Sequence, residues 1–202
     1  MRKTYASEKG KPVDLSRLTA DRLPLDIYQK AHQGLVLPCQ DVAIEHQGGI
    51  LLVNRDNNPA KNVLWPLGGR LERGMTQESS LREKVRNESG LSLLDPLIYL
   101  GQGRTFFNTD PFEHGHGTDT ENSRYFARST GILNLDSDHS KPIIVKPSDY
   151  NPEFRAALEP YVQDFLDMAI HLVGQPEKWL WETKELIDQS LLAIILRNPK
   201  KS

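Results

Sequence analysis

The order of the predicted elements constrains the fold of this chain more than any single residue does. One helix, predicted over residues 77–89, lies between two groups of predicted strands. Thr76 is a suitable N-cap for this helix, and Gly90 stands where a left-handed residue commonly ends a helix. Strands that surround one central helix, followed by helices at the end of the chain, favour an α/β fold in which helices sandwich a mixed sheet.

Alternating apolar residues and turn signals locate the other elements. Residues 40–46 and 50–55 read as strands, and Gln47-Gly48-Gly49 between them is typical of a hairpin turn. A short helix over residues 25–32, ended by Gly34, precedes them. Further strands are predicted at 97–100, 104–108, 123–128 and 143–146, and further helices at 152–172 and 177–196.

The length of 202 residues suits one domain with extensions. We expect an N-terminal extension over residues 1–24, an α/β domain over 25–150 and a helical extension over 151–202. The apolar surface of the last predicted helix suggests an interface, and hence a homodimer, although packing against this chain's own sheet is an equal alternative.

Composition and charge exclude several classes of partner. With 25 basic and 27 acidic residues, the chain offers no basic stripe for nucleic acid. No apolar run approaches the ~18 residues of a membrane span, and no signal-peptide core is present, so a cytoplasmic location is expected. The single cysteine, Cys39, excludes an internal disulfide and is interpreted as a small buried residue beside a strand.

Glu88 is predicted to lie on the inward face of the central helix. On a helical wheel it shares one stripe with Leu81 and Val85. Burying an unpaired carboxylate is costly, so Glu88 needs a partner. Lys84, one turn earlier, could form an ion pair with it, or Glu88 could hold a divalent cation in front of the Gly68-Gly69 loop. The spacing alone leaves both arrangements open.

The segment 69–91 resembles the Nudix box, a motif that runs from a first glycine to a last glycine. When the first glycine is aligned with Gly69, the last glutamate of the box falls on Glu88 and the last glycine on Gly90. A normal box gathers several carboxylates on one helix face to bind magnesium beside a pyrophosphate. This sequence departs from the motif at four other positions, where Met75, Glu83, Lys84 and Asn87 replace Glu, Arg, Glu and Glu.

The GDP-mannose mannosyl hydrolase branch of the Nudix family is similar in keeping essentially the last glutamate. The resemblance to that branch covers residues 26–150. Leu37-Pro38-Cys39-Gln40-Asp41-Val42 resembles its first strand, and Gly117-Thr118-Asp119 its sugar-side loop. Asp138-His139 lies where the branch has a metal-binding Gln and a base His.

The resemblance implies a Nudix-type α/β/α sandwich and a magnesium-dependent hydrolase whose partner is a small-molecule nucleotide sugar, similar to GDP-mannose. Water would attack the anomeric carbon of the sugar, and the nucleoside diphosphate would leave. A diphosphate leaving group needs its developing charge neutralised. The implied roles are metal binding by Glu88, the Gly69 carbonyl and Asp138; general base catalysis by His139; phosphate contacts by Arg70 with Arg55; stabilisation of positive charge on the sugar by Asp41; and sugar contacts by Asp119.

Simpler interpretations stay open for several of these residues. Asp138 and His139 equally suit a solvated loop, Arg55 a strand end that points into water, and Asp41 the surface of an alternating strand. The two histidines of the loop over 110–121 have no third ligand at matching spacing, so the sequence favours a place on the loop surface. These two residues are His114 and His116.

Two other functions compete with sugar transfer to water. One is an ordinary pyrophosphohydrolase that cleaves between phosphates, which Lys84 and Asn87 disfavour because they replace acids of the box. The other is a non-catalytic Nudix domain that senses a nucleotide sugar or binds another protein. Met75, Glu83 and Lys84 favour this second alternative.

Overall fold

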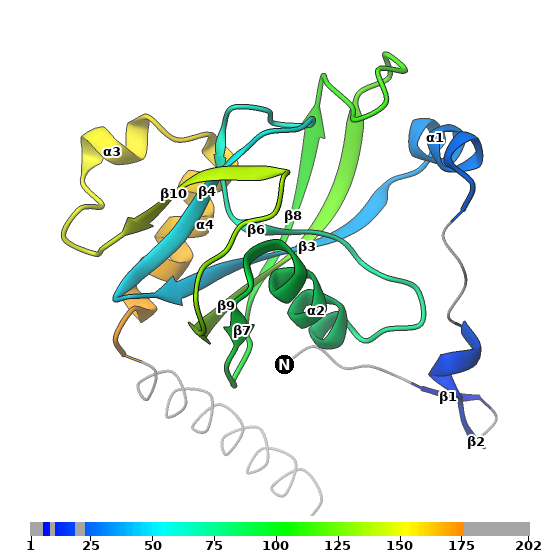
Figure 1. Cartoon of the computed structure of the whole chain (residues 1–202), viewed down its shortest axis with the longest axis horizontal. Helices are drawn as coiled ribbons and strands as arrows, with labels where there is room; N and C mark the ends of the chain where they lie inside the picture. Colours follow the sequence, from blue (N-terminus) through cyan, green and yellow to red (C-terminus); the bar gives the residue numbers. More distant parts are fainter. Residues whose placement is uncertain (1–5, 9–10, 19–22, 176–202) are drawn as a thin grey trace, which may run out of the picture.

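Helix α2 (Gln77–Ser89) covers one face of a mixed sheet and helix α4 (Pro160–Ala169) the other, in a computed structural model that describes residues 6–8, 11–18 and 23–175 (Figure 1). The α/β sandwich expected from the order of the elements is therefore confirmed. None of the described helices is long and apolar enough to cross a membrane.

Strand β3 (Leu37–His46) is the centre of the sheet. It pairs antiparallel with β4 (Gly49–Arg55) and β6 (Leu67–Arg70), and parallel with β9 (Thr118–Thr130). The residues of β3 therefore lie beside residues from three other parts of the sequence. The outer strands are β5 (Leu64–Trp65) and β10 (His139–Val145), which pair with β4, and β7 (Ser92–Leu93) and β8 (Ile98–Phe107), which pair with β9.

Two hydrophobic cores form because successive residues of a strand point to opposite faces of the sheet. Ile44 of β3 packs beneath α2 in a cluster with Leu81, whereas its neighbour Ala43 packs beneath α4 with Phe165. Helix α4 thus belongs to the core of the domain, although the sequence analysis placed residues 151–202 in an extension.

Helix α2 has the two ends that the sequence predicts. The side chain of Thr76 caps its N-terminus by accepting a hydrogen bond of 3.1 Å from the backbone N–H of Ser79. Gly90 ends the helix in the left-handed conformation, with φ of 69°. These local signals place the helix, and with it Lys84 and Glu88, at one edge of β6.

The helix predicted over residues 152–172 is interrupted. It divides into α3 (Pro152–Ala156), α4 and the short 3-10 helix η2 (Ile170–Leu172). Proline disfavours a helical conformation of the preceding residue, and Glu159, just before Pro160, is extended. The helix predicted over residues 177–196, with the interface proposed for it, lies outside the described residues.

Two strand predictions also need correction. The strands predicted at 97–100 and 104–108 are one strand, β8, whose register against β9 shifts between Tyr99 and Gly101. Strand β10 begins at His139 rather than near residue 143, so this histidine belongs to the sheet and is not part of a solvated loop.

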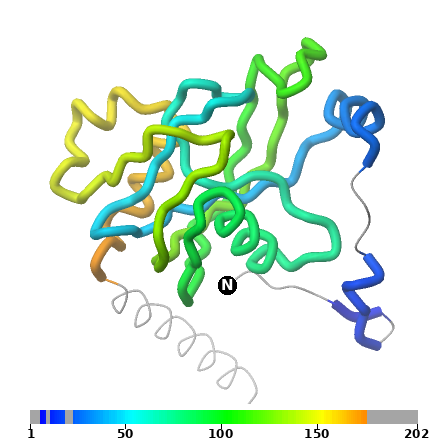
Figure 2. The backbone as a smooth tube through the Cα atoms, in the orientation of Figure 1, coloured from blue at the N-terminus to red at the C-terminus, as the bar shows by residue number. Residues whose placement is uncertain are grey.

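The N-terminal elements lead into α1 (Leu25–Gly34), which lies beside the connection between β8 and β9 (Figure 2). His32 Nδ1 and His114 Nε2 are 2.8 Å apart, and the His114 side chain is only 5% exposed. The expectation of a surface position is therefore wrong for His114, because α1 covers it; His116 is exposed. The earlier elements are β1 (Ser7–Glu8), β2 (Lys11–Pro12) and the 3-10 helix η1 (Leu15–Leu18).

Candidate functional site

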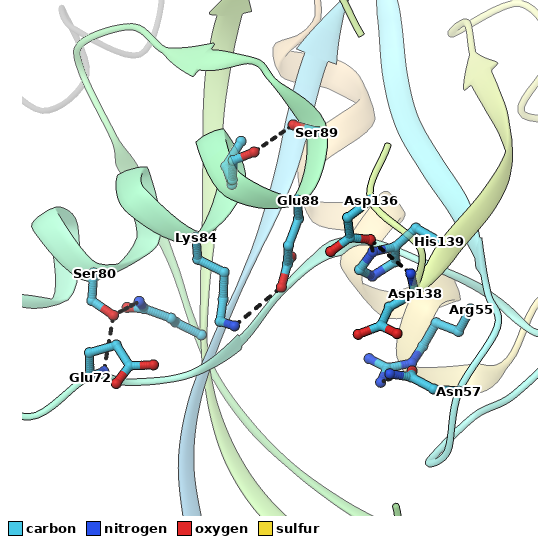
Figure 3. Close-up of polar contacts among 12 residues, drawn as sticks. Arg55, Asn57, Glu72, Ser80, Lys84, Glu88, Ser89, Asp136, Asp138 and His139 are labelled. Atoms are coloured by element: carbon cyan, nitrogen blue, oxygen red, sulfur yellow. Dashed lines mark hydrogen bonds and ion pairs between the residues drawn. The ribbon is translucent and has the colours of Figure 1, made fainter. Parts of the chain in front are cut away.

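Lys84 and Glu88 form an ion pair on α2. The Lys84 ammonium lies 3.2 Å from Glu88 Oε1, as the dashed line in Figure 3 marks. The second oxygen of Glu88, Oε2, is buried and has no hydrogen-bond partner. Burial raises the pKa of Glu88, and the charges of Lys84 and His139 oppose that rise. The ion-pair alternative for Glu88 is therefore the arrangement present.

The same ammonium lies against β6. A Cβ built on Gly69 would be 3.2 Å from Lys84 Nζ, so a side chain at this position would displace the end of Lys84 by a few tenths of an ångström. The register of the β3–β6 pairing places Gly69 opposite Gln40. Lys84 thus stands between α2 and β6, where a divalent cation between Glu88 and Gly69 was the alternative arrangement.

Asp41 is buried at the centre of this region. Its carboxylate accepts a hydrogen bond of 2.6 Å from the hydroxyl of Tyr161 on α4. Burial raises the pKa of Asp41 to about 6, and the hydrogen bond from Tyr161 and the charge of Arg55 oppose that rise. Asp41 is therefore buried against α4 and does not lie on the surface of an alternating strand.

Two arginines flank Asp41. Arg55, at the end of β4, donates to Asn57 Oδ1 at 3.0 Å (Figure 3), while its Nε is buried without a partner. Arg124 of β9 lies directly opposite Asp41 in the parallel pairing, and its Nε is also buried and unpartnered. Four side-chain atoms of this kind occur in the part of the chain that the structure describes, and three of them belong to Arg55, Glu88 and Arg124, whose charges all act on Asp41.

Arg70 closes another side of the region. It pairs with Cys39 across β6 and β3, and its guanidinium lies 4.4 Å from the ring centre of Tyr28 on α1. Burial and the charge of Asp41 raise the pKa of Cys39 to about 12, whereas Lys84, Arg70 and Arg55 lower it. The charges of Lys84, Arg70 and Arg55 thus act on one thiol from three elements of the fold.

His139 stands on β10, opposite Arg55 in the register with β4. Its Nδ1 is 2.7 Å from Asp136 Oδ1, and Figure 3 shows this pair on the side of Glu88 that faces away from Lys84. The backbone N–H of Asp136 in turn donates to the Glu88 carbonyl at 3.0 Å. With Nδ1 donating to a carboxylate, Nε2 of His139 is the basic nitrogen.

Two of the predicted site residues, Asp138 and Asp119, interact with arginines. Asp138 is exposed, and its charge acts on Arg55. Asp119 forms a two-pronged ion pair with Arg104, with contacts of 3.0 and 2.7 Å. A carboxylate bound in this way has fewer oxygen lone pairs for a sugar hydroxyl.

An open cavity of about 460 Å³ adjoins Asp41 through Tyr161. The ring of Trp65 stacks on Tyr161, with 4.9 Å between the ring centres, and Phe107 packs beside Trp65. The cavity walls include Asn58, Val63, Trp65, Phe106, Phe107 and Tyr161.

Sequence reasoning missed Tyr161, Arg124 and Asp136 as site residues. Asp136 lies in the polar stretch around His139, which carried a local signal. Tyr161 and Arg124 carried none, because they meet Asp41 only through the tertiary fold.

The site does not fit the resident metal centre that the resemblance implies. Among the described residues, no group of three His, Cys, Asp or Glu side chains could hold a metal ion. Glu88 offers one unpartnered oxygen, and a divalent cation on that carboxylate would be repelled by the nearby Lys84 ammonium. The donor set therefore favours an ammonium over a metal at this position.

Comparisons with known proteins identify the fold. No protein-family model matches the sequence. The structure is similar to a MutT Nudix hydrolase from Burkholderia pseudomallei, with a TM-score of 0.53 and 18% identity over 66% of this chain and 98% of that one. It is also similar to a Nudix hydrolase from Nitrosomonas europaea, with a TM-score of 0.52 and 19% identity over 66% and 88% of the two chains. The chain therefore has the Nudix fold, and its structural neighbours are Nudix and MutT hydrolases.

A curated relative gives a narrower comparison. The sequence is 27% identical over 152 residues to the low-salt glycan biosynthesis protein Agl8 of Haloferax volcanii. The aligned region covers 72% of this chain and 90% of that protein.

Proposed function

We propose that this protein hydrolyses a nucleoside-diphosphate sugar and releases the nucleoside diphosphate. The observation that carries the proposal is the group of buried, unpartnered polar atoms on Arg55, Glu88 and Arg124 around Asp41. Buried polar atoms without partners are costly in a folded protein. A ligand that brings anionic oxygens and hydroxyl groups would complete their hydrogen bonds.

The division of the site supports a two-part substrate. Arg55 and Arg70, with Lys84, face a diphosphate with positive charge, as guanidinium groups commonly do. The aromatic cavity around Trp65 and Tyr161 offers flat apolar walls for the sugar or the base. The name of the Haloferax relative, a glycan biosynthesis protein, is consistent with a sugar-containing substrate.

The proposed reaction adds water to the anomeric carbon. His139, oriented by Asp136, takes the proton of the attacking water, and the bond from the anomeric carbon to the diphosphate oxygen breaks. Asp41 stabilises the positive charge that develops on the sugar ring. The positive charges of Arg55, Arg70 and Lys84 neutralise the leaving diphosphate.

Hydrolysis in oxygen-18 water tests which bond breaks. We expect the label on the released sugar, because water attacks carbon. Label on a phosphate would instead show an ordinary pyrophosphohydrolase, the activity that the Nudix fold of the neighbours supports. Binding of nucleotide sugars without turnover would favour the sensor, for which Lys84 in the box is the specific observation.

A histidine substitution tests the assignment of the base. H139N should lower kcat about 100-fold or more, the usual contribution of a general base, with little change in KM. The matched control is H171N, because His171 is exposed on η2. Equal rates for H139N and wild type would remove His139 from the mechanism.

A further inference from the structure

We propose that Lys84 is the resident cation of this site and binds the diphosphate together with Arg55 and Arg70, in the place where a divalent metal ion was expected. This inference rests on the proposed function and deepens it. It predicts that the protein binds a diphosphate without added metal, through an ammonium group that its own sequence supplies.

The position of Lys84 is the first argument. Its ammonium is held from one side by Glu88, at 3.2 Å, and passes close to Gly69 on the other. Both side chains of the pair are largely buried, with 24% of Lys84 and 14% of Glu88 exposed. A lysine without a partner on a helix surface would extend its ammonium into water. Here the ammonium is directed into the space between α2 and strand β6 (Figure 3).

The donors of the ammonium are the second argument. A lysine ammonium carries three N–H donors. Its described hydrogen bond, to Glu88 Oε1, uses one of them. The other two are available for the oxygens of a phosphate group, and Lys84 can therefore act as a point charge between Glu88 and an anion.

The neighbouring charges are the third argument. Arg70 pairs with Cys39 in the β3–β6 register, and Gly69, against which the Lys84 ammonium lies, pairs with the next residue, Gln40. Arg55 stands at the end of β4, opposite His139. Three separate elements of the fold, α2, β6 and β4, thus supply the cations. Three such charges can neutralise a diphosphate leaving group without the dehydration that a magnesium ion requires.

Calorimetric titration of the full chain with inorganic pyrophosphate in EDTA tests the inference. We expect wild type to bind, and K84M to bind about 10- to 100-fold more weakly, because charged hydrogen bonds are lost. K84R, which retains the charge, should recover most of the affinity. K146M is the matched control, since Lys146 is exposed after β10, and it should bind as wild type does.

Binding of Mn²⁺ alone, followed by electron paramagnetic resonance, provides a second measurement. Wild type should not bind the ion, whereas K84E, which sets a second carboxylate one turn before Glu88, should gain Mn²⁺ affinity. Pyrophosphate binding that requires a metal, or that K84M leaves unchanged, would overturn the role of Lys84 while the nucleotide-sugar proposal stands. No pyrophosphate binding with or without metal would overturn both.

Discussion

The pKa values of single residues in this site depend on burial as much as on their hydrogen-bond partners. Asp41 shows this best, because burial raises its pKa to about 6 even though Tyr161 donates a hydrogen bond to it. The folded protein therefore holds a proton on Asp41 in a range of pH where the unfolded chain has lost it. The cost of ionising this carboxylate is part of the free energy of unfolding.

The proton on Asp41 should make the stability of the protein depend on pH. Because the folded pKa of Asp41 is raised, wild type should lose stability as pH rises from about 4 to about 6, and the full penalty should remain above that range. D41N, which cannot ionise, should not show this loss. The difference between the two proteins should change by up to about 3 kcal/mol. Urea unfolding at pH 4 and pH 7.5 measures it; parallel pH profiles would contradict the assignment.

Strands β3 and β6 approach each other closely at the site. Gly68 of β6 faces Asp41 of β3, and a Cβ there would lie 2.2 Å from the Gln40 carbonyl oxygen and 2.4 Å from Asp41 Oδ1. G68A should therefore force β6 away from β3 and cost about 1–3 kcal/mol of stability. The matched control is G34A, at the end of α1, where a Cβ meets nothing within 4 Å. Urea unfolding compares the two variants, and equal midpoints would show that β6 can yield without cost.

At the level of elements, the sequence predicts what local rules decide. Thr76 and Gly90 gave the ends of α2 because a cap and a left-handed terminator act within one turn. The spacing of Lys84 and Glu88 likewise allowed their ion pair. The contact of Tyr161 with Asp41 joins residues 120 positions apart, and no local pattern reveals it. Pro160 shows that a local rule can also overrule a longer pattern. The apolar pattern continued one helix through this region, but the proline keeps Glu159 extended and ends the helix before it.

On the scale of the whole molecule, α1 is attached through aromatic and histidine contacts. Tyr28 and His32 pack at right angles to Phe112, and His32 meets His114. Tyr28 also lies under Arg70, so the helix that precedes the sheet supports a residue of the proposed site. The homodimer stays a prediction, because the terminal helix on which it depends lies outside the described residues.

Hydrogen exchange tests this attachment. H114A removes a buried partner of His32, and the amides of residues 25–34 should then exchange about 10-fold faster or more. The control is H171A, because His171 is exposed and distant in sequence from α1. Unchanged protection of α1 in H114A would mean that Phe112 and Tyr28 hold the helix without the histidine pair.

The half-buried position of Cys39 has a consequence for labelling chemistry. Cys39 is the single cysteine of the chain, and its pKa of about 12 leaves almost no thiolate at neutral pH. Thiolate is the species that reacts with maleimides and with oxidants. We therefore expect a cysteine introduced on the surface to react with a spin label or fluorophore before Cys39 does.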